Sequence, residues 1–205
     1  MAASWAGSDS RSGLLVTVLA VVALGAVHVA AQTGIWLRRA DLPKPRDWPS
    51  AVEVGGRIYV IGGYANWRAL SVVEVYDPAT DTWESRRSMN LPRYEVATCV
   101  VDGKILAIGG LLSNMTTAAR EVELYDPATD VWTDRAPVPP RSGGGCCYAT
   151  VVADRVYLFS SWNGAAYSNS FDVYDPRTDT WTHQGQMPRE SFDVVTCLAQ
   201  GRICA

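Results

Sequence analysis

Few side chains in this sequence could carry out chemistry, and they are scattered. A metal or nucleophilic centre would have to use His183 or one of the five cysteines, because the other histidine, His28, lies in an apolar N-terminal run. No Cys-x-x-Cys pair occurs, and zinc or copper sites need several such ligands close together. The sequence therefore predicts no metal and no cofactor, and it favours the cysteines as small buried side chains. These are Cys99, Cys146, Cys147, Cys197 and Cys204.

Acid–base catalysis would need a carboxyl group paired with a second proton carrier, together with a group that holds the substrate. Glu95, Glu190 and Asp193 are the candidates, but no spacing singles them out. His183 follows Trp181 closely and is expected to be exposed on an outer strand. We therefore predict no catalytic residue, and binding is the favoured activity.

The composition is that of an ordinary globular protein, with 48% hydrophobic and 19% charged residues. The net charge is −3 and the isoelectric point is about 5.4. Such a chain has no basic field to attract nucleic acid, so we expect no nucleic-acid partner.

An apolar run covers residues 14–31 and ends in Val29-Ala30-Ala31, with small residues where signal peptidase cleaves. We predict a signal peptide over residues 1–31, and hence a secreted or periplasmic protein. The alternative is a membrane anchor, because eighteen apolar residues are just enough to span a bilayer. Arg38 and Arg39, which follow the run, count mildly against export. A membrane is a partner only if the segment stays uncleaved.

The rest of the chain repeats a pattern of strands and turns. Val75–Trp83 reads VYDPATDTW, and close copies follow at Leu124–Trp132 and Val173–Trp181, each forty-nine residues after the last. Ahead of each copy two apolar, β-branched stretches flank a short turn, and the first two copies have Gly-Gly or Asp-Gly there and a second Gly-Gly at the end. In Asp-Pro-x-Thr-Asp, proline presets a turn and the leading Asp accepts backbone N–H groups.

This pattern resembles the kelch repeat, whose period is about fifty residues. The resemblance implies an all-β fold, a β-propeller of four-stranded blades whose strands run a to d from inside to outside. We expect residues 32–205 to form a partial propeller, with a strand d at 33–42, blades at about 46–90, 93–138 and 141–187, and a partial blade at 189–205. Such an inventory is too small to close a ring, so we expect a fragment of a longer protein.

Ligands of kelch proteins commonly meet the end of the ring that carries the b–c and d–a connections. The d–a connections each carry an arginine, Arg93 and Arg141 among them, which suits an acidic or sugar ligand, although a recurring residue more often holds the blade together. The b–c loops carry residues that differ between blades and are better candidates. The candidate binding residues are Tyr64, Asn66, Trp67, Arg68, Arg93, Arg141, Trp162, Asn163 and Tyr167, and Asn114 opens a glycosylation sequon, Asn-Met-Thr.

We therefore expect a propeller that binds a protein or a glycan through this loop face. Two alternatives come from resembling groups: a sialic-acid mutarotase-like enzyme, and a substrate adaptor of cullin-type ubiquitin ligases. Adaptors of the second kind carry a BTB domain ahead of the repeats, whereas here about forty residues precede the first repeat.

Overall fold

The computed structural model describes residues 37–162, 165–190, 197–199 and 202–204. It divides into two units, Met1–Arg39 and Ala40–Ala205, and all the described strands belong to the second unit. The predicted signal segment, residues 1–31, lies outside the described residues. Within the described ranges, no helix is long and apolar enough to cross a membrane.

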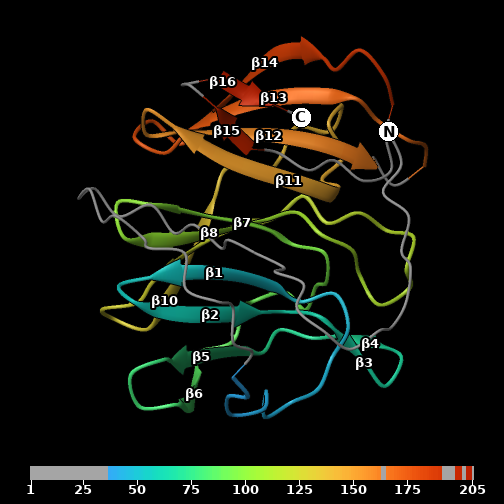
Figure 1. Ribbon diagram of the computed structural model, residues 1–205. Helices are drawn as coiled ribbons and strands as arrows, with labels where there is room; N and C mark the ends of the chain where they lie inside the picture. Colours follow the sequence, from blue (N-terminus) through green and yellow to red (C-terminus); the bar gives the residue numbers. More distant parts are fainter. Residues whose placement is uncertain (1–36, 163–164, 191–196, 200–201, 205) are drawn as a thin grey trace, which may run out of the picture. The chain divides into compact units, whose positions relative to one another are not determined.

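Three antiparallel four-stranded sheets follow one another along the chain (Figure 1). The first contains β1 (Ser50–Val54), β2 (Arg57–Ile61), β5 (Val73–Asp77) and β6 (Thr82–Arg86). The second contains β7 (Ala97–Val101), β8 (Lys104–Ile108), β9 (Val122–Asp126) and β10 (Val131–Arg135). The third contains β11 (Gly145–Val152), β12 (Arg155–Trp162), β13 (Ser170–Asp175) and β14 (Thr180–Gln186).

Two short hairpins complete the described strands. β3 (Tyr64–Ala65) pairs with β4 (Arg68–Ala69) in the b–c connection of the first blade. β15 (Cys197–Ala199) pairs with β16 (Arg202–Cys204), within the residues 189–205 for which the sequence predicted a partial blade. Residues 37–42, the described part of the predicted strand 33–42, form no strand.

The turns between strands a and b have the left-handed geometry of tight hairpins. Gly55 and Gly56 have φ of 61° and 80°, and Asp102 and Gly103 have φ of 50° and 70°. Two consecutive positive φ angles define the turn whose twist matches the flanking strands. The third blade reaches the same turn with Ala153 and Asp154. The sequence prediction of tight turns at Gly-Gly and Asp-Gly is confirmed.

The YDPxTDxW motif holds each blade to the chain that leaves the blade before it. In the second blade Tyr125 Oη donates to Asp130 at 2.7 Å, and its ring lies 4.9 Å from that of Trp132. Asp130 accepts the N–H of Arg87 at 2.9 Å, and Trp132 Nε1 donates to the Arg87 carbonyl at 2.8 Å. We call this set of contacts the interblade clasp.

The clasp recurs in the other two blades. Asp81 and Trp83 bind the backbone of Ala40 in the first blade, and Asp179 and Trp181 bind that of Ala136 in the third. Ala40 therefore takes the place that a strand d of a preceding blade would supply. The motif aromatics serve blade packing, and Tyr76, Tyr125, Trp132 and Tyr174 are buried.

The core lies between the sheets rather than within one sheet. One apolar cluster joins the first two blades, where Ile61 and Val73 pack with Ile105 and Tyr125. A second cluster joins the second and third blades. The innermost strands β1, β7 and β11 lie next to one another in that order (Figure 1). This arrangement puts the starts of three innermost strands side by side.

Candidate functional site

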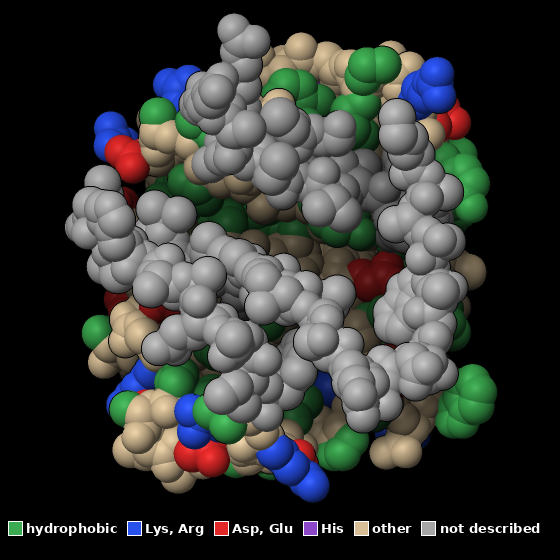
Figure 2. All heavy atoms as spheres, viewed as in Figure 1, with side chains coloured by type: hydrophobic (Ala, Val, Ile, Leu, Met, Phe, Trp, Pro, Cys, Tyr) green, Lys and Arg blue, Asp and Glu red, His purple; other side chains and the backbone are tan. Residues whose placement is uncertain are grey.

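The most exposed aromatic side chain of the loop face stands on the β3–β4 hairpin. Asn66 and Trp67 form its two-residue turn with φ of 51° and 62°, and the side chain of Trp67 is 84% exposed. Such turns favour glycine at the second position, so a tryptophan there is strained and gains nothing from packing. Asn66 and Arg68 are also exposed. In Figure 2, hydrophobic side chains protrude at the right edge, where Figure 1 draws this hairpin.

The loops of the next two blades add apolar surface. Met115, also at positive φ, is 46% exposed, and Tyr167 is 52% exposed. Asn114 accepts the N–H groups of Thr116 and Thr117 at 3.2 and 2.9 Å, so the predicted glycosylation site lies in an exposed, ordered turn. A glycan at Asn114 would stand beside Met115.

Trp48 connects the loops to the space between the innermost strands. Its side chain is 49% exposed, and its ring lies 6.0 Å from that of Tyr64 and 5.5 Å from that of Tyr94. A pocket of about 320 Å³, the outer pocket, lies on one side of it. Its lining residues are Asp47, Trp48, Tyr64, Ala65, Asn66, Trp67 and Met115.

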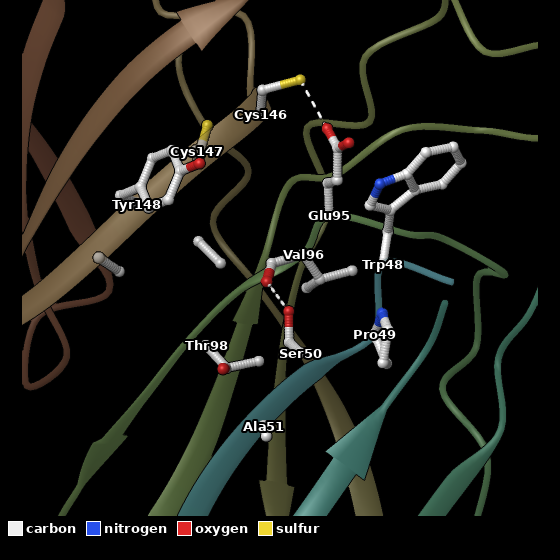
Figure 3. Close-up of a pocket in the computed structure, with 12 residues that line it drawn as sticks. Trp48, Pro49, Ser50, Ala51, Glu95, Val96, Thr98, Cys146, Cys147 and Tyr148 are labelled. Atoms are coloured by element: carbon white, nitrogen blue, oxygen red, sulfur yellow. Dashed lines mark hydrogen bonds between the residues drawn. The ribbon is translucent and has the colours of Figure 1, made fainter. Parts of the chain in front are cut away.

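A second pocket of about 400 Å³, the inner pocket, lies between the three innermost strands (Figure 3). Three short segments line it, one from the start of each strand: 48–51, 95–98 and 146–149. Trp48 therefore belongs to both pockets. In Figure 3 the side chain of Glu95 lies between those of Trp48 and Cys146.

Each of the three segments begins with a strained residue. Trp48, Glu95 and Cys146 have φ of 49°, 51° and 47°. A non-glycine residue in this conformation costs on the order of 1 kcal/mol or more, and such residues cluster at functional sites. The N–H of Glu95 donates to the carbonyl of Trp48 at 3.1 Å, which fixes two of the three relative to each other. Strain repeated at one level of three blades indicates a preorganised rim.

The electrostatics of the rim centre on one carboxylate. Cys146 Sγ donates to Glu95 Oε2 at 2.8 Å, and the Cys146 side chain is buried. Burial raises the pKa of neighbouring Tyr94 to about 12, and the charge of Glu95 adds to the shift. Tyr94 thus stays a neutral phenol beside the carboxylate at physiological pH.

Arg93 does not face a ligand, which corrects the sequence assignment. Its side chain is fully buried, donating to the carbonyls of Gly109 and Glu121 at 2.8 and 2.6 Å and pairing with Glu123 at 2.8 Å. Arg46 makes the same kind of pair with Glu74 at 2.6 Å. The recurring arginines of the first two blades thus hold strands of their own blade together. This is the structural role that the sequence analysis gave as the alternative to ligand binding.

The third blade replaces this pair with a hydroxyl cluster. Asp172 stands where the other blades have Glu74 and Glu123, and it is fully buried. Ser142 and Ser170 donate to its Oδ2, and His183 Nδ1 lies 3.0 Å from its Oδ1. Arg141 is 55% exposed and lies 3.8 Å from Asp172, so it is accessible from solvent.

The remaining candidates fall into three groups. Tyr64 is buried against Tyr94, with ring centroids 5.1 Å apart, and lines the outer pocket. Trp162 is half-buried, and its Nε1 donates to the Thr116 carbonyl at 3.2 Å, so it links two blades; its ring also contacts Tyr167. Asn163 lies outside the described residues. Accessible candidates are Asn66, Trp67, Arg68, Arg141 and Tyr167.

Of the acid–base candidates, Glu95 enters the inner pocket and Glu190 is exposed, whereas Asp193 lies outside the described residues. His183 is on the outer strand β14 with its side chain 38% exposed. In the described part of the chain, no three His, Cys, Asp or Glu side chains are grouped to hold a metal. Cys99, Cys146 and Cys147 are buried, and Cys146 and Cys147 pack into different clusters.

The sequence reasoning missed the rim residues Trp48, Glu95 and Cys146. They lie at corresponding places in three blades, near the start of the innermost strand, but they differ in chemical type. Their spacings of forty-seven and fifty-one residues depart from the repeat period of forty-nine residues. A usable signal was present, because Trp48 and Glu95 each lie two residues after the arginine of a d–a connection that was already suspected of binding, and Cys146 lies five residues after Arg141.

Radially neighbouring four-stranded antiparallel sheets, with cores between them and a pocket at the innermost strands, define a β-propeller. A family model described as "FKB95, Kelch-repeats domain" matches residues 35–170, so the chain belongs to the kelch-repeat family. An F-box/kelch-repeat protein of Arabidopsis thaliana is 40% identical over 82 residues, which are 40% of this chain and 22% of that protein. Kelch-like ECH-associated protein 1B of Danio rerio is 34% identical over 82 residues, 38% of this chain and 14% of that protein.

A solved structure named "Structure of YjhT" matches with a TM-score of 0.66 at 18% identity, covering 75% of this chain and 56% of the other. At that identity the match shows a shared fold. The present chain spans less than a quarter of the length of the two curated relatives named above.

Proposed function

We propose that this kelch propeller is a protein-binding module whose partner docks on the loop face. The main support for this proposal is the position of the exposed apolar side chains. Of the seven large hydrophobic residues exposed in the described ranges, four belong to this face. They are Trp48, Trp67, Met115 and Tyr167. Exposed aromatic and methionine side chains gathered on one face are typical of interface anchors.

The names of the relatives favour a protein over a glycan as the partner. One pairs kelch repeats with an F-box, and another is named as associated with a second protein. These names also favour a second candidate function, a substrate adaptor of a ubiquitin ligase, in which the same face would bind the substrate. A glycan ligand is the outcome that would count against both.

The experiment is a selection of peptide ligands on the immobilised full chain from a random peptide library, run in parallel with a glycan array. We expect selected peptides to lose binding when Trp67 is changed to alanine. Val131→Ala is the matched control, because Val131 is 44% exposed but lies on the outer strand β10. Peptides that bind both variants equally, or ligands found only on the glycan array, would contradict the proposal.

We also propose that the protein is exported, on the sequence of residues 14–31 alone. N-terminal sequencing of the protein made by its own host should then begin at or near Gln32. An intact Met1 in a detergent-dependent membrane fraction would favour the anchor, and an intact Met1 in the cytosol would favour the adaptor.

A further inference from the structure

The charged lining of the two pockets is acidic, opposite to the sign that the arginines of the sequence suggested. Glu95 is the charged residue among the twelve described residues that line the inner pocket, and Asp47 is the one among the seven of the outer pocket. Arg46 directly precedes Asp47, and Arg93 lies two residues before Glu95. Both arginines turn into their blades, where they pair with Glu74 and Glu123. The carboxylates at the rim therefore face the pockets with no arginine or lysine among the described lining residues.

An aromatic wall stands beside the Glu95 carboxylate. The half-exposed ring of Trp48 lines both pockets and is backed by the rings of Tyr64 and Tyr94. An indole face attracts a cation through its quadrupole, and a carboxylate pairs with a guanidinium through two parallel hydrogen bonds. A planar guanidinium can make both contacts at once, which a compact ammonium does less well.

The rim is built to keep this geometry before a ligand arrives. The thiol of Cys146 donates to one oxygen of Glu95, and the backbone of Glu95 is tied to that of Trp48. The three positive φ angles set the direction in which each Cα–Cβ bond leaves the backbone. Because the groups are already placed, little ordering would oppose binding.

We propose that the inner pocket receives an arginine side chain of the protein partner, held between the indole of Trp48 and the carboxylate of Glu95. This inference rests on the proposed function and names the chemistry of its ligand: a basic peptide segment that inserts one arginine where the innermost strands begin. The pocket volume of about 400 Å³ suits an inserted side chain rather than a globular surface. The partner's remaining apolar residues then cover Trp67 and Met115.

The probe is N-acetyl-arginine methylamide, titrated into the full chain and followed by the fluorescence of tryptophan and by ligand-observed NMR. The matched probe is the citrulline analogue, which has the same shape without the charge. We expect the arginine probe to bind at least tenfold more tightly than the citrulline probe. Glu95→Gln should remove most of that preference, because glutamine keeps the size and the acceptor oxygen but not the charge.

Glu84→Gln is the control variant, since Glu84 carries an exposed carboxylate on the outer strand β6. It should leave the affinity for arginine unchanged. A thermal melt of each variant confirms that it is folded. Absence of arginine binding to the wild-type chain, equal binding of both probes, or undiminished binding to Glu95→Gln would overturn the inference. Selected peptides that need Trp67 but contain no basic residue would overturn it too, while leaving the proposed function intact.

Discussion

Replacing Arg93 by methionine should destabilise the folded protein without changing the loop face. Methionine fills a similar volume, so the change removes the charge and its hydrogen bonds rather than creating a large cavity. It leaves Glu123 buried without its ion pair, and it leaves the carbonyls of Gly109 and Glu121 without the donors that now lie 2.8 and 2.6 Å away. Burial lowers the pKa of Arg93, while the charge of Glu123 opposes this shift. Glu123 therefore stabilises the buried charge of Arg93.

Breaking a buried pair by removing one partner costs about 3–5 kcal/mol, most of it from the charge left behind. We therefore expect Arg93→Met to lower the free energy of unfolding by that amount, measured by urea denaturation followed by tryptophan fluorescence. Adding Glu123→Gln to the same chain should restore at least about 1 kcal/mol. The amide carries no charge yet still offers an acceptor to the N–H of Asn90, now 2.7 Å from Glu123.

The third blade supplies the matched control. Arg141 is 55% exposed and lies 3.8 Å from Asp172, so Arg141→Met should cost less than about 1 kcal/mol. Equal costs for Arg93→Met and Arg141→Met would refute the argument that burial decides the role of the recurring arginines. So would an Arg93→Met protein of undiminished stability that fails to bind a ligand of the loop face.

Three further predictions concern the contacts described above. Gly109→Ala should cost several kcal/mol in urea denaturation, because its Cβ would lie 2.0 Å from the Gly144 carbonyl of the next blade, whereas Gly103→Ala meets nothing within 4 Å and should cost only about 1 kcal/mol of backbone strain. Trp132→Ala should lower the free energy of unfolding by about 3–5 kcal/mol, because Trp132 is buried. Trp67→Ala should leave the melting temperature unchanged while weakening peptide binding by about 1–3 kcal/mol. Equal melting temperatures of these two variants would contradict the prediction. The hydrogen bond from Tyr125 lowers the pKa of Asp130 below its usual 3.8, so this bond stabilises the fold above that pH and is lost as the pH falls through the lowered value. The Asp130→Asn variant should therefore lose less stability than the wild-type chain as the pH falls below about 4. Parallel stability profiles of the two proteins in acid would refute this prediction.

The repeat predicted the blades because blade packing uses the same residues each time. Tyr125 and Trp132 have copies at fixed intervals, so their structural role could be inferred without coordinates. The first two a–b turns were predictable for the same reason, since positive φ selects Gly and Asp, whereas the third turn uses Ala153 and Asp154. Strand β12 differs from its counterparts: with Ser160 and Ser161 in place of two glycines, it runs on to Trp162, whereas β2 and β8 end at Ile61 and Ile108.

The candidate site was less predictable because it depends on side-chain direction. Arg93 and Arg141 look alike in sequence, yet one is buried against a glutamate and the other is exposed, since Ser142 takes the buried place in the third blade. No sequence pattern around Glu95 marks it as a site residue, and only the backbone turn just before strand β7 brings it beside Trp48. Such placement arises from the tertiary packing of three strands, which periodicity does not encode.

The interblade clasp gives the propeller a direction. In every clasp the later blade supplies the aspartate and tryptophan, and the earlier chain supplies only a backbone segment: Ala40, Arg87 or Ala136. During synthesis each emerging blade thus meets a segment that has already left the ribosome, and it can close its clasp at once. Assembly can proceed vectorially from the N-terminal side, one blade at a time, with no need to wait for residues still to be made.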